Sequence, residues 1–518
     1  MRHPRGAAPV GGLLLSLVLT ACAVQPEAPD AEVATCEGRP RAHCVRSVSL
    51  GGRFACAALR DQTVWCWGRN DESQLGYDSA DLCPERLSGG QTRAVACHMA
   101  PLQVPGLARV VALSAGGAHT CAVLSGGELR CWGRNVRGQL GNGSALPSRA
   151  PVAVGGLGRV VSVAAGAQHT CAATAEGAVY CWGANDRGQL GVEESPSVCA
   201  AEGAMGPCAR TPVRVAGVAN VVEVAAGDSH TCARTSGGGV WCWGTNTDGQ
   251  LGAGTAGGRP THEPQAVLLG VNPLRRVRAL AAGGDHTCAT REDGAVLCWG
   301  RHDRGQLGVA VPESFEPCTH ACIRTAVPIV GYEGAPVTED PDAGFEDFDV
   351  PAEPLDAASR DAAPMDAGTR PDAGGDVTRR DAGDAGDTSD AGDASEPGDV
   401  AREAADPPPP SAVTVSAGDS FSCLSLSDGT LRCWGTNRSY ELGNGRVNEG
   451  GAALTTVIAS PGSAATNPLQ GVVRVESGGA TSCAVLTDRG LKCWGTNELG
   501  ALGIGNTSEQ NGPVAVTW

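Results

Sequence analysis

Four histidines recur at one position of an internal repeat, where a ring of imidazoles could bind a metal ion or transfer protons. Each lies in the motif Gly-x-x-His-Thr-Cys-Ala. Other copies of the repeat carry Phe54, Phe421 and Thr481 at this position. Because phenylalanine and threonine cannot replace a metal-binding imidazole, we expect these positions to serve packing or internal hydrogen bonding. The four histidines are His119, His169, His230 and His286.

Pairs of cysteines spaced ten residues apart are the second set of residues that could take part in chemistry, here by forming disulfide bonds. Ser125-Gly-Gly-Glu128 separates Cys121 from Cys131 and supplies the residues of a tight turn. The two cysteines are therefore expected to face each other across a β-hairpin, where β-carbons are close enough for a disulfide bond. The seven expected hairpin pairs are Cys56/Cys66, Cys121/Cys131, Cys171/Cys181, Cys232/Cys242, Cys288/Cys298, Cys423/Cys433 and Cys483/Cys493.

Eight of the other nine cysteines form four local pairs, and the ninth is expected to carry a lipid. Complete pairing is typical of an oxidising compartment outside the cytosol. The pairs are Cys36/Cys44, Cys83/Cys97, Cys199/Cys208 and Cys318/Cys322, and the ninth cysteine is Cys22. Zinc is the alternative for Cys318, His320 and Cys322. We do not favour it, because the chain has no Cys-x-x-Cys motif and the cluster lacks a second half.

The second cysteine of each hairpin begins a Cys-Trp-Gly, which most copies extend to Gly-Gln-Leu-Gly. The tryptophans could form a ligand-stacking surface, but their place beside a strand cysteine favours core packing. Gly-Gln-Leu-Gly has no following lysine or helix and is not a phosphate loop. No Gly-x-Ser-x-Gly occurs and no cysteine remains as a nucleophile. We therefore predict no catalytic residue, metal site or cofactor.

Acidity is confined to one segment. Residues 333–410 hold 22 acidic and 5 basic side chains, which account for the whole net charge of −17. Their repeated Asp-Ala-Gly triplets predict a disordered insertion, since such a segment cannot bury enough apolar surface to fold. Calcium binding is a weaker alternative, because the spacing of a calcium loop is missing. The rest of the chain is neutral and lacks a basic stripe, which argues against nucleic-acid binding.

The N-terminus has the pattern of an export signal. Arg2 and Arg5 precede an apolar run, Val10 to Thr20, that is too short to cross a bilayer. Leu19-Thr20-Ala21-Cys22 resembles the lipobox of bacterial lipoproteins, which implies cleavage before Cys22 and lipid attachment to it. An ordinary secretory signal is the alternative. We expect a signal peptide at 1–21, a flexible tether at 22–35 and a lipid anchor on the periplasmic or outer face of a bacterial envelope membrane.

A second repeated element separates the hairpins. Ala150 to Gly166 predicts a strand at Pro151–Val154, a turn, and another strand at Arg159–Ala164. Two strands here and two in the hairpin make four per repeat. Seven such repeats predict an all-β fold, a seven-bladed β-propeller. We place blades 1–5 and the start of blade 6 at 36–331, the acidic insertion at 332–410, and the remainder of the propeller at 411–518.

The chain ends suggest how the ring closes. The first hairpin is not preceded by a Pro-Val-x-Val strand, whereas the chain finishes with Pro513-Val-Ala-Val516. We therefore expect the C-terminal strand to complete the first blade. Pairing of the two ends would then close the propeller.

The repeat resembles that of the regulator of chromosome condensation family. Gly-x-x-His-Thr-Cys-Ala followed by Cys-Trp-Gly-x-Asn-x-x-Gly-Gln-Leu-Gly carries the resemblance, over residues 45–331 and 411–518. It implies a seven-bladed propeller. Functions in the family range from nucleotide exchange on a small nuclear GTPase to enzyme inhibition by secreted bacterial propellers, so fold transfers better than function. The export signal, paired cysteines and acidic insertion set this chain apart from the nuclear members.

Positions that vary between repeats are candidates for protein recognition, because repeat proteins combine a constant core with changing loops. Unconstrained surface variation is the alternative. We expect a monomeric, non-catalytic protein-binding scaffold; capture of a secreted enzyme is the alternative, and nucleotide-exchange regulation a weaker one. The varying residues precede Cys-Trp-Gly (Trp65, Arg130, Tyr180, Trp241, Leu297, Arg432, Lys492) or follow it (Arg69, Arg134, Ala184, Thr245, Arg301, Thr436, Thr496).

Overall fold

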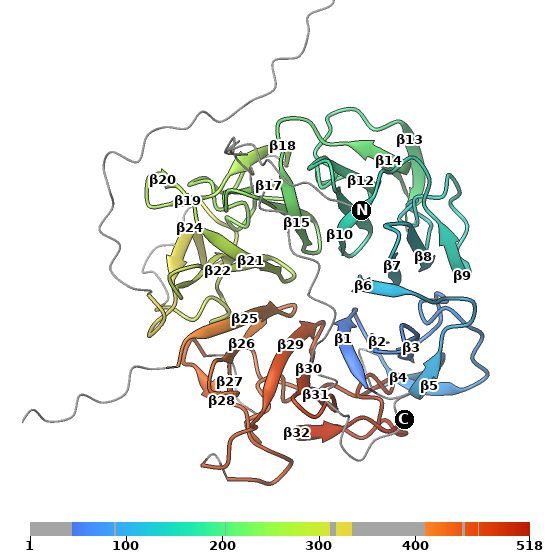
Figure 1. Cartoon of the computed structure of the whole chain (residues 1–518), viewed down its shortest axis with the longest axis vertical. Coiled ribbons are helices and arrows are strands. Elements are labelled where there is room, and N and C mark those ends of the chain that lie inside the picture. The colour runs from blue at the N-terminus through green and yellow to red at the C-terminus, as the bar shows by residue number, and fades with distance from the viewer. Residues whose placement is uncertain are drawn as a thin grey trace, which may run out of the picture.

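Seven sheets, antiparallel except for one short parallel pair, form a closed ring around a central channel (Figure 1). The computed structural model describes residues 44–87, 90–201, 204–258, 260–310, 317–333, 410–447, 451–464 and 466–518. Within these ranges all regular secondary structure is β-strand. The predicted all-β, seven-bladed propeller is confirmed. The signal peptide, the tether and the acidic insertion fall outside the described residues, except for residues 332, 333 and 410.

Each blade runs outward through four strands in chain order, and in two blades an inserted strand precedes the outer one. The inner strands, which line the channel, are β1 (Val45–Leu50), β6 (Val110–Ala115), β10 (Val160–Ala165), β15 (Val221–Ala226), β21 (Val277–Ala282), β25 (Ala412–Ala417) and β29 (Val472–Gly478). The second strands are β2 (Phe54–Leu59), β7 (His119–Leu124), β11 (His169–Thr174), β16 (His230–Thr235), β22 (His286–Arg291), β26 (Phe421–Leu426) and β30 (Thr481–Leu486).

The third and outer strands complete each sheet. The third strands are β3 (Val64–Arg69), β8 (Leu129–Gly133), β12 (Val179–Ala184), β17 (Val240–Gly244), β23 (Val296–Arg301), β27 (Leu431–Gly435) and β31 (Leu491–Gly495). The outer strands are β5 (Thr92–Gln103), β9 (Ser148–Ala153), β14 (Ala204–Arg214), β18 (Thr261–Ala266), β24 (Cys322–Pro328), β28 (Thr455–Thr456) and β32 (Gln510–Ala515). Insertions add β4 (Leu82–Arg86), β13 (Ser197–Ala201), β19 (Leu268–Leu269) and β20 (Asn272–Pro273).

The expected pairing of the C-terminal strand with the first blade is wrong. β32 pairs with β31 inside blade 7. The Pro-Val-x-Val strand therefore ends its own blade and does not begin the next one, and blade 1 starts with its own inner strand, β1. For the same reason the acidic insertion lies between blades 5 and 6, because β24 closes blade 5 and β25 opens blade 6. No part of blade 6 precedes the insertion.

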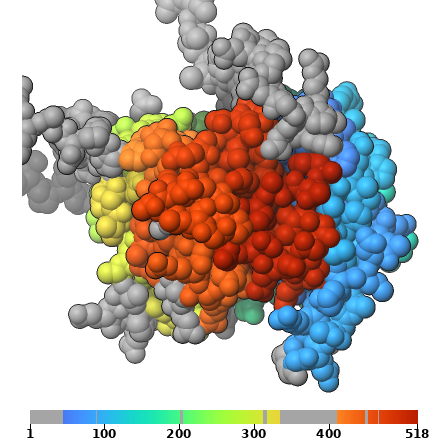
Figure 2. Space-filling model, turned by 90° about the horizontal axis from the view of Figure 1, so that it is seen from below, coloured from blue at the N-terminus to red at the C-terminus, as the bar shows by residue number. Residues whose placement is uncertain are grey.

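The C-terminal segment still closes the ring, through packing. Blades 1 and 7 lie side by side (Figures 1 and 2) and share an apolar core that includes Val45, Trp67 and Val516. Trp518 meets Trp65 and Trp67 edge-on, with ring centroids 6.1 and 6.2 Å apart. A seam closed by side chains needs no exchange of strands between the ends.

The propeller has two faces, one at each end of the central channel. The face that carries the Gly-Gln-Leu-Gly loops and the turns from inner to second strands is called the loop face here. The opposite face carries the hairpin turns between second and third strands and is called the turn face. The Cys-Trp-Gly motif requires glycine because the backbone just before the second strand lies very close. Gly133 has φ of +101°, and a Cβ there would lie 2.7 Å from the Ala118 carbonyl oxygen.

Candidate binding surfaces around the central channel

The recurring histidines join neighbouring blades. His119 Nε2 lies 2.8 Å from Thr170 Oγ1 in the next blade, and Thr170 donates to the Gln139 carbonyl oxygen at 2.9 Å. The single hydroxyl proton is used in that second bond, so His119 must donate from Nε2. The same bond recurs for His169 with Thr231, His230 with Thr287, and His286 with Ser422.

These histidines are fully buried, and burial lowers their pKa. The values fall to about 4 for His119 and His230 and to about 3 for His169 and His286. They are therefore neutral at physiological pH, with Nε2 committed to the neighbouring blade. A metal-binding or proton-transfer ring is not compatible with this arrangement, whereas the expected hydrogen-bonding role is.

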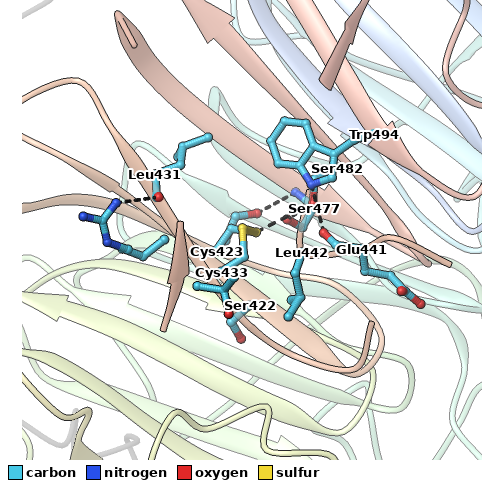
Figure 3. The surroundings of a disulfide bond; sticks show 12 residues. Ser422, Cys423, Leu431, Cys433, Glu441, Leu442, Ser477, Ser482 and Trp494 are labelled. Carbon is cyan, nitrogen blue, oxygen red and sulfur yellow. Dashed lines mark hydrogen bonds between the residues drawn. A yellow bond between two sulfur atoms is a disulfide. The ribbon is translucent and has the colours of Figure 1, made fainter. Parts of the chain in front are cut away.

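The repeated tryptophans and glutamines belong to the same junction. Trp182 Nε1 donates to the Gln139 carbonyl oxygen at 2.9 Å, beside the bond from Thr170. The Gln139 side chain accepts from the Arg137 backbone N–H and so shapes its own loop. Figure 3 shows the junction of blades 6 and 7, where Trp494 donates to the Glu441 carbonyl. All seven Cys-Trp-Gly tryptophans are fully buried, so they form no ligand-stacking surface.

One loop residue with a role that sequence reasoning missed is the asparagine after Cys-Trp-Gly. Asn135 accepts from the Leu140 backbone N–H and donates to the carbonyls of Ser144 and Leu146. His302 takes this position in blade 5, accepting from Leu307 N at Nδ1 and donating to Val309 O from Nε2. The recurrence of Asn at one position was the available signal. Its role is to hold the loop, not to bind a ligand.

The hairpin cysteines are directly opposed in the strand register. The structure joins each expected pair by a disulfide bond, with Cα atoms 4.1 Å apart in every case, and Figure 3 shows the bond of blade 6. In blade order the bonds are Cys56–Cys66, Cys121–Cys131, Cys171–Cys181, Cys232–Cys242, Cys288–Cys298, Cys423–Cys433 and Cys483–Cys493.

These disulfides are structural and do not form a functional site. The second-strand sulfur faces the next blade, as Cys171 Sγ does at 3.6 Å from the Thr231 hydroxyl. The third-strand cysteines lie beside the buried tryptophans, inside the apolar cores between blades. Although they count among the expected site residues, none of them is accessible to a ligand or a reductant. The fully buried third-strand cysteines are Cys66, Cys131, Cys181, Cys242, Cys298, Cys433 and Cys493.

The local cysteine pairs are described in part. Three further disulfides join Cys83–Cys97, Cys199–Cys208 and Cys318–Cys322. Cys44 is also disulfide-bonded, whereas Cys36 and Cys22 lie outside the described residues.

The Cys318–Cys322 bond also argues against zinc binding at this cluster. It commits both sulfur atoms, and His320 instead contacts the Asp248 carboxylate at 3.2 Å. Across the described residues, no three or more His, Cys, Asp or Glu side chains are arranged to hold a metal ion.

The blade 1 insertion is fastened to the loop face by a cluster of charges. The buried Glu85 carboxylate contacts Arg53 at 3.0 Å, Arg69 at 3.2 Å and Arg93 at 2.5 Å. Arg69 also binds Asp71 through two hydrogen bonds of 2.6 Å. The pKa of Arg69 is raised, first by the hydrogen bond to Asp71. Arg69, a predicted recognition residue, therefore serves at least in part to dock the insertion.

The other varying positions are divided between core and surface. Leu297, Ala184 and Thr245 are buried and cannot contact a partner. Arg301 binds Asp303, and Lys492 donates to the Ala459 carbonyl. Arg130 is exposed on the third strand of blade 2. The two sets of positions therefore do not form one continuous recognition surface.

The central channel is a cavity of about 1210 Å³ lined by the inner strands. Each inner strand is the edge of its sheet and has backbone groups without a strand partner. Serine side chains of one inner strand accept hydrogen bonds from such N–H groups on the inner strand of the next blade. Ser49 Oγ accepts from Ala115 N, Ser114 Oγ from Ala165 N, and Ser416 Oγ from Ser477 N, at 2.9, 2.9 and 2.7 Å. These channel serines are structural and are not candidate nucleophiles.

Acidic side chains gather at the loop-face mouth of the channel. Asp228, Asp285 and Asp419 come from corresponding turns of three consecutive blades. Asp228 and Asp419 line the mouth and are open to solvent, yet the surrounding ring of protein limits their hydration. This desolvation, followed by the charges of Asp419 and Asp285, raises the pKa of Asp228 to about 7. Desolvation also raises the pKa of Asp419.

Comparison with known proteins agrees with this geometry. An RCC1-like domain matches residues 17–341, and a regulator of chromosome condensation (RCC1) repeat matches residues 412–441. The chain belongs to the RCC1-like family. The RCC1-like propeller resembles the crystal structure of human WBSCR16 with a TM-score of 0.60 and 20% identity, covering 89% of this chain and 94% of that one. Prp20p from Saccharomyces cerevisiae gives a TM-score of 0.55 and 19% identity, covering 85% and 82%.

Curated relatives share the repeat but not the whole chain. The RCC1-like propeller is 31% identical over 269 residues to the mitochondrial RCC1 domain-containing protein RUG3 of Arabidopsis thaliana, covering 51% of this chain and 44% of that protein. The ultraviolet-B receptor UVR8 of the same plant is 27% identical over 263 residues, covering 51% and 42%. The chain thus spans less than half the length of these relatives. Among the residues that the structure describes, no helix is long and apolar enough to cross a membrane.

Proposed function

We propose that this RCC1-like propeller is an exported, lipid-anchored, non-catalytic protein-binding scaffold at a bacterial cell envelope. One observation carries the binding part of the proposal. The histidines, tryptophans, glutamines and hairpin cysteines that repeat from blade to blade all serve blade junctions or hairpin cores. The chemical variety left on the molecule lies in loops and insertions at its surface, which is how repeat proteins recognise partners.

Export and anchoring are supported by the N-terminal pattern and by the cysteine chemistry. Cys22 follows a lipobox-like Leu-Thr-Ala, and the described cysteines are disulfide-bonded, as is typical of an oxidising compartment. Replacing Cys22 with alanine should move the protein from the membrane fraction to the soluble extracellular or periplasmic fraction. Membrane partitioning that is unchanged in Cys22→Ala would contradict lipid anchoring.

The partner is best sought in the producing cell. A proximity-labelling enzyme can be inserted near Gly386, within the acidic segment that separates β24 from β25 in the chain. Repeated labelling of a few envelope proteins, lost on release of the Cys22→Ala variant, supports the anchored scaffold. One tightly bound secreted enzyme, whose activity falls in the complex, would favour the inhibitor alternative. Labelling of cytosolic proteins alone would overturn the export argument.

A further inference from the structure

Cationic side chains from blades 1 and 7 line the central channel at its turn-face end. Arg46, Arg60 and Arg489 line the same cavity, with Gln62 beside them. Arg46 belongs to the inner strand of blade 1, Arg60 and Gln62 to the hairpin turn of that blade, and Arg489 to the hairpin turn of blade 7. The ring closure therefore brings together residues more than four hundred positions apart in the chain.

A β-bulge presents Arg46. The register of β1 against β2 shifts between Val45 and Ser47, which makes Arg46 the extra residue. Such bulges re-aim a side chain and are frequent next to binding sites. Arg60 lies at the same end of the blade, because its backbone N–H donates to the Cys44 carbonyl at 2.8 Å. The corresponding bulge positions of the other blades are Val111, Val161, Val222, Arg278, Val413 and Val473.

Gln62 and Arg489, the other two residues of the group, have a left-handed backbone conformation. Gln62 and Arg489 have φ of 67° and 63° at the hairpin-turn position that is glycine in the remaining blades. A non-glycine residue there costs about 1 kcal/mol. The Arg489 carbonyl is held across the seam by the Val45 backbone N–H at 3.1 Å. The chain thus tolerates strain at the two turns whose side chains line the channel. The corresponding glycines are Gly127, Gly177, Gly238, Gly294 and Gly429.

Three nearby carboxylates, Asp61, Glu223 and Glu476, bind other groups. Asp61 accepts from the backbone N–H and the hydroxyl of Thr63, at 3.0 and 2.6 Å. Glu476 binds Arg474 and Glu223 binds Arg234, each at 2.6 Å. Arg46 and Arg60 form no ion pair with any residue that the structure describes.

The two mouths of the channel therefore differ in charge. Aspartates gather at the loop face and arginines at the turn face, so a negative ligand is drawn to the turn face. Guanidinium groups bind phosphate and carboxylate through paired hydrogen bonds. The small serine and alanine side chains farther along the channel leave room for the rest of a ligand.

We propose that the turn-face mouth at blades 1 and 7 is a binding site for an anionic ligand. A phosphate or carboxylate group lies between Arg46 and Arg60, with Arg489 and Gln62 beside it. This site does not depend on the protein-binding role proposed above.

Isothermal titration calorimetry of the full chain with pyrophosphate and with citrate tests the site. We expect at least one probe to bind with Kd on the order of 1 mM or tighter. Each of Arg46→Gln and Arg60→Gln should weaken that binding about tenfold or more, since each removes a charged hydrogen-bonding partner. A preference for pyrophosphate identifies a phosphate ligand, and a preference for citrate a carboxylate ligand.

Arg278→Gln is the matched control. Arg278 occupies the same bulge position in blade 5 but does not line the cavity, so its replacement should leave binding unchanged. Thermal unfolding of each variant establishes that the propeller is intact. No measurable binding of either probe by the wild-type chain would overturn the proposal. So would equal affinity of wild type and the Arg46→Gln, Arg60→Gln double variant.

Discussion

The hydroxyl of Thr170 lies 2.8 Å from Nε2 of His119 in the preceding blade. It donates its proton to the Gln139 carbonyl, which also accepts from Trp182. Two repeated side chains, Thr170 and Trp182, thus meet at one backbone oxygen, and His119 joins them through the Thr170 hydroxyl. The bond between a histidine and a hydroxyl of the next blade recurs for His169, His230 and His286. The repeated histidines and tryptophans, which in the sequence are candidates for metal binding or ligand stacking, are the residues that attach each blade to the next.

Replacing Thr170 with valine should lower the free energy of unfolding by about 1–3 kcal/mol, because it leaves the buried His119 N–H without an acceptor. Thr120→Val is the matched control. Thr120 also donates to the preceding blade, at the Gln74 carbonyl, but that blade carries Phe54 at the histidine position. Its replacement should cost about 1 kcal/mol or less. Equal losses in urea unfolding would show that the histidine bond contributes nothing.

Buried neutral histidines should make the propeller sensitive to acid. Their pKa values in the folded chain, about 3 to 4, lie below the unfolded value of 6.5, so the unfolded chain binds more protons between these limits. Their contribution to stability is complete above about pH 6.5 and is lost as the pH falls. His169→Phe, which copies Phe54 and Phe421, should reduce the slope of unfolding free energy between pH 4.5 and 6 by about 1.4 kcal/mol per pH unit. An unchanged slope would mean that His169 is protonated in the folded chain.

Asp228 should affect the pH dependence of stability in the opposite direction to the histidines. Its folded pKa of about 7 exceeds the unfolded value of 3.8, so the folded chain binds the extra proton and stability falls as the pH rises between them. Asp228→Asn should therefore raise stability at pH 8, by less than about 1 kcal/mol because the side chain is exposed. At pH 3 the two proteins should unfold alike in a thermal melt. A stabilisation that is larger at pH 3 than at pH 8 would refute this assignment.

Closure of the ring should depend on the last residues of the chain. Trp518→Ala removes two edge-on contacts, to Trp65 and Trp67, and should cost about 1–3 kcal/mol. Deletion of 511–518 removes most of β32 and the buried Val516 and should cost more. Urea unfolding measures both. Unchanged midpoints would exclude these residues from the seam.

Cys318–Cys322 should be the first of the structurally described disulfides to open under mild reduction. Cys318 is half-buried, whereas the hairpin cysteines have no exposed surface. Alkylation and mass spectrometry after brief treatment with reductant should label Cys318 and Cys322 before Cys121 and Cys131. Simultaneous labelling of all four would show that the blades open as readily as this loop.

The sequence by itself determined the repeat, the strand count and the hairpin register, because these depend on local spacing. Cys121 and Cys131 lie symmetrically about a turn, and no distant contact is needed to place them opposite each other. The same local reasoning assigned Pro513–Val516 to the wrong blade. A strand between two hairpins can pair with either one, and the sequence pattern is the same in both cases.

Tertiary structure decided what depends on neighbouring blades. The acceptor of each histidine is a threonine or serine about fifty or more residues away, supplied by the next blade. The contact between the Val45 N–H and the Arg489 carbonyl exists only because the ring closes. Burial separated Leu297 and Ala184 from the exposed Arg130, although all three occupy positions that vary between repeats. Variation in a sequence does not show which side of a blade a residue faces, since that depends on how the blades pack.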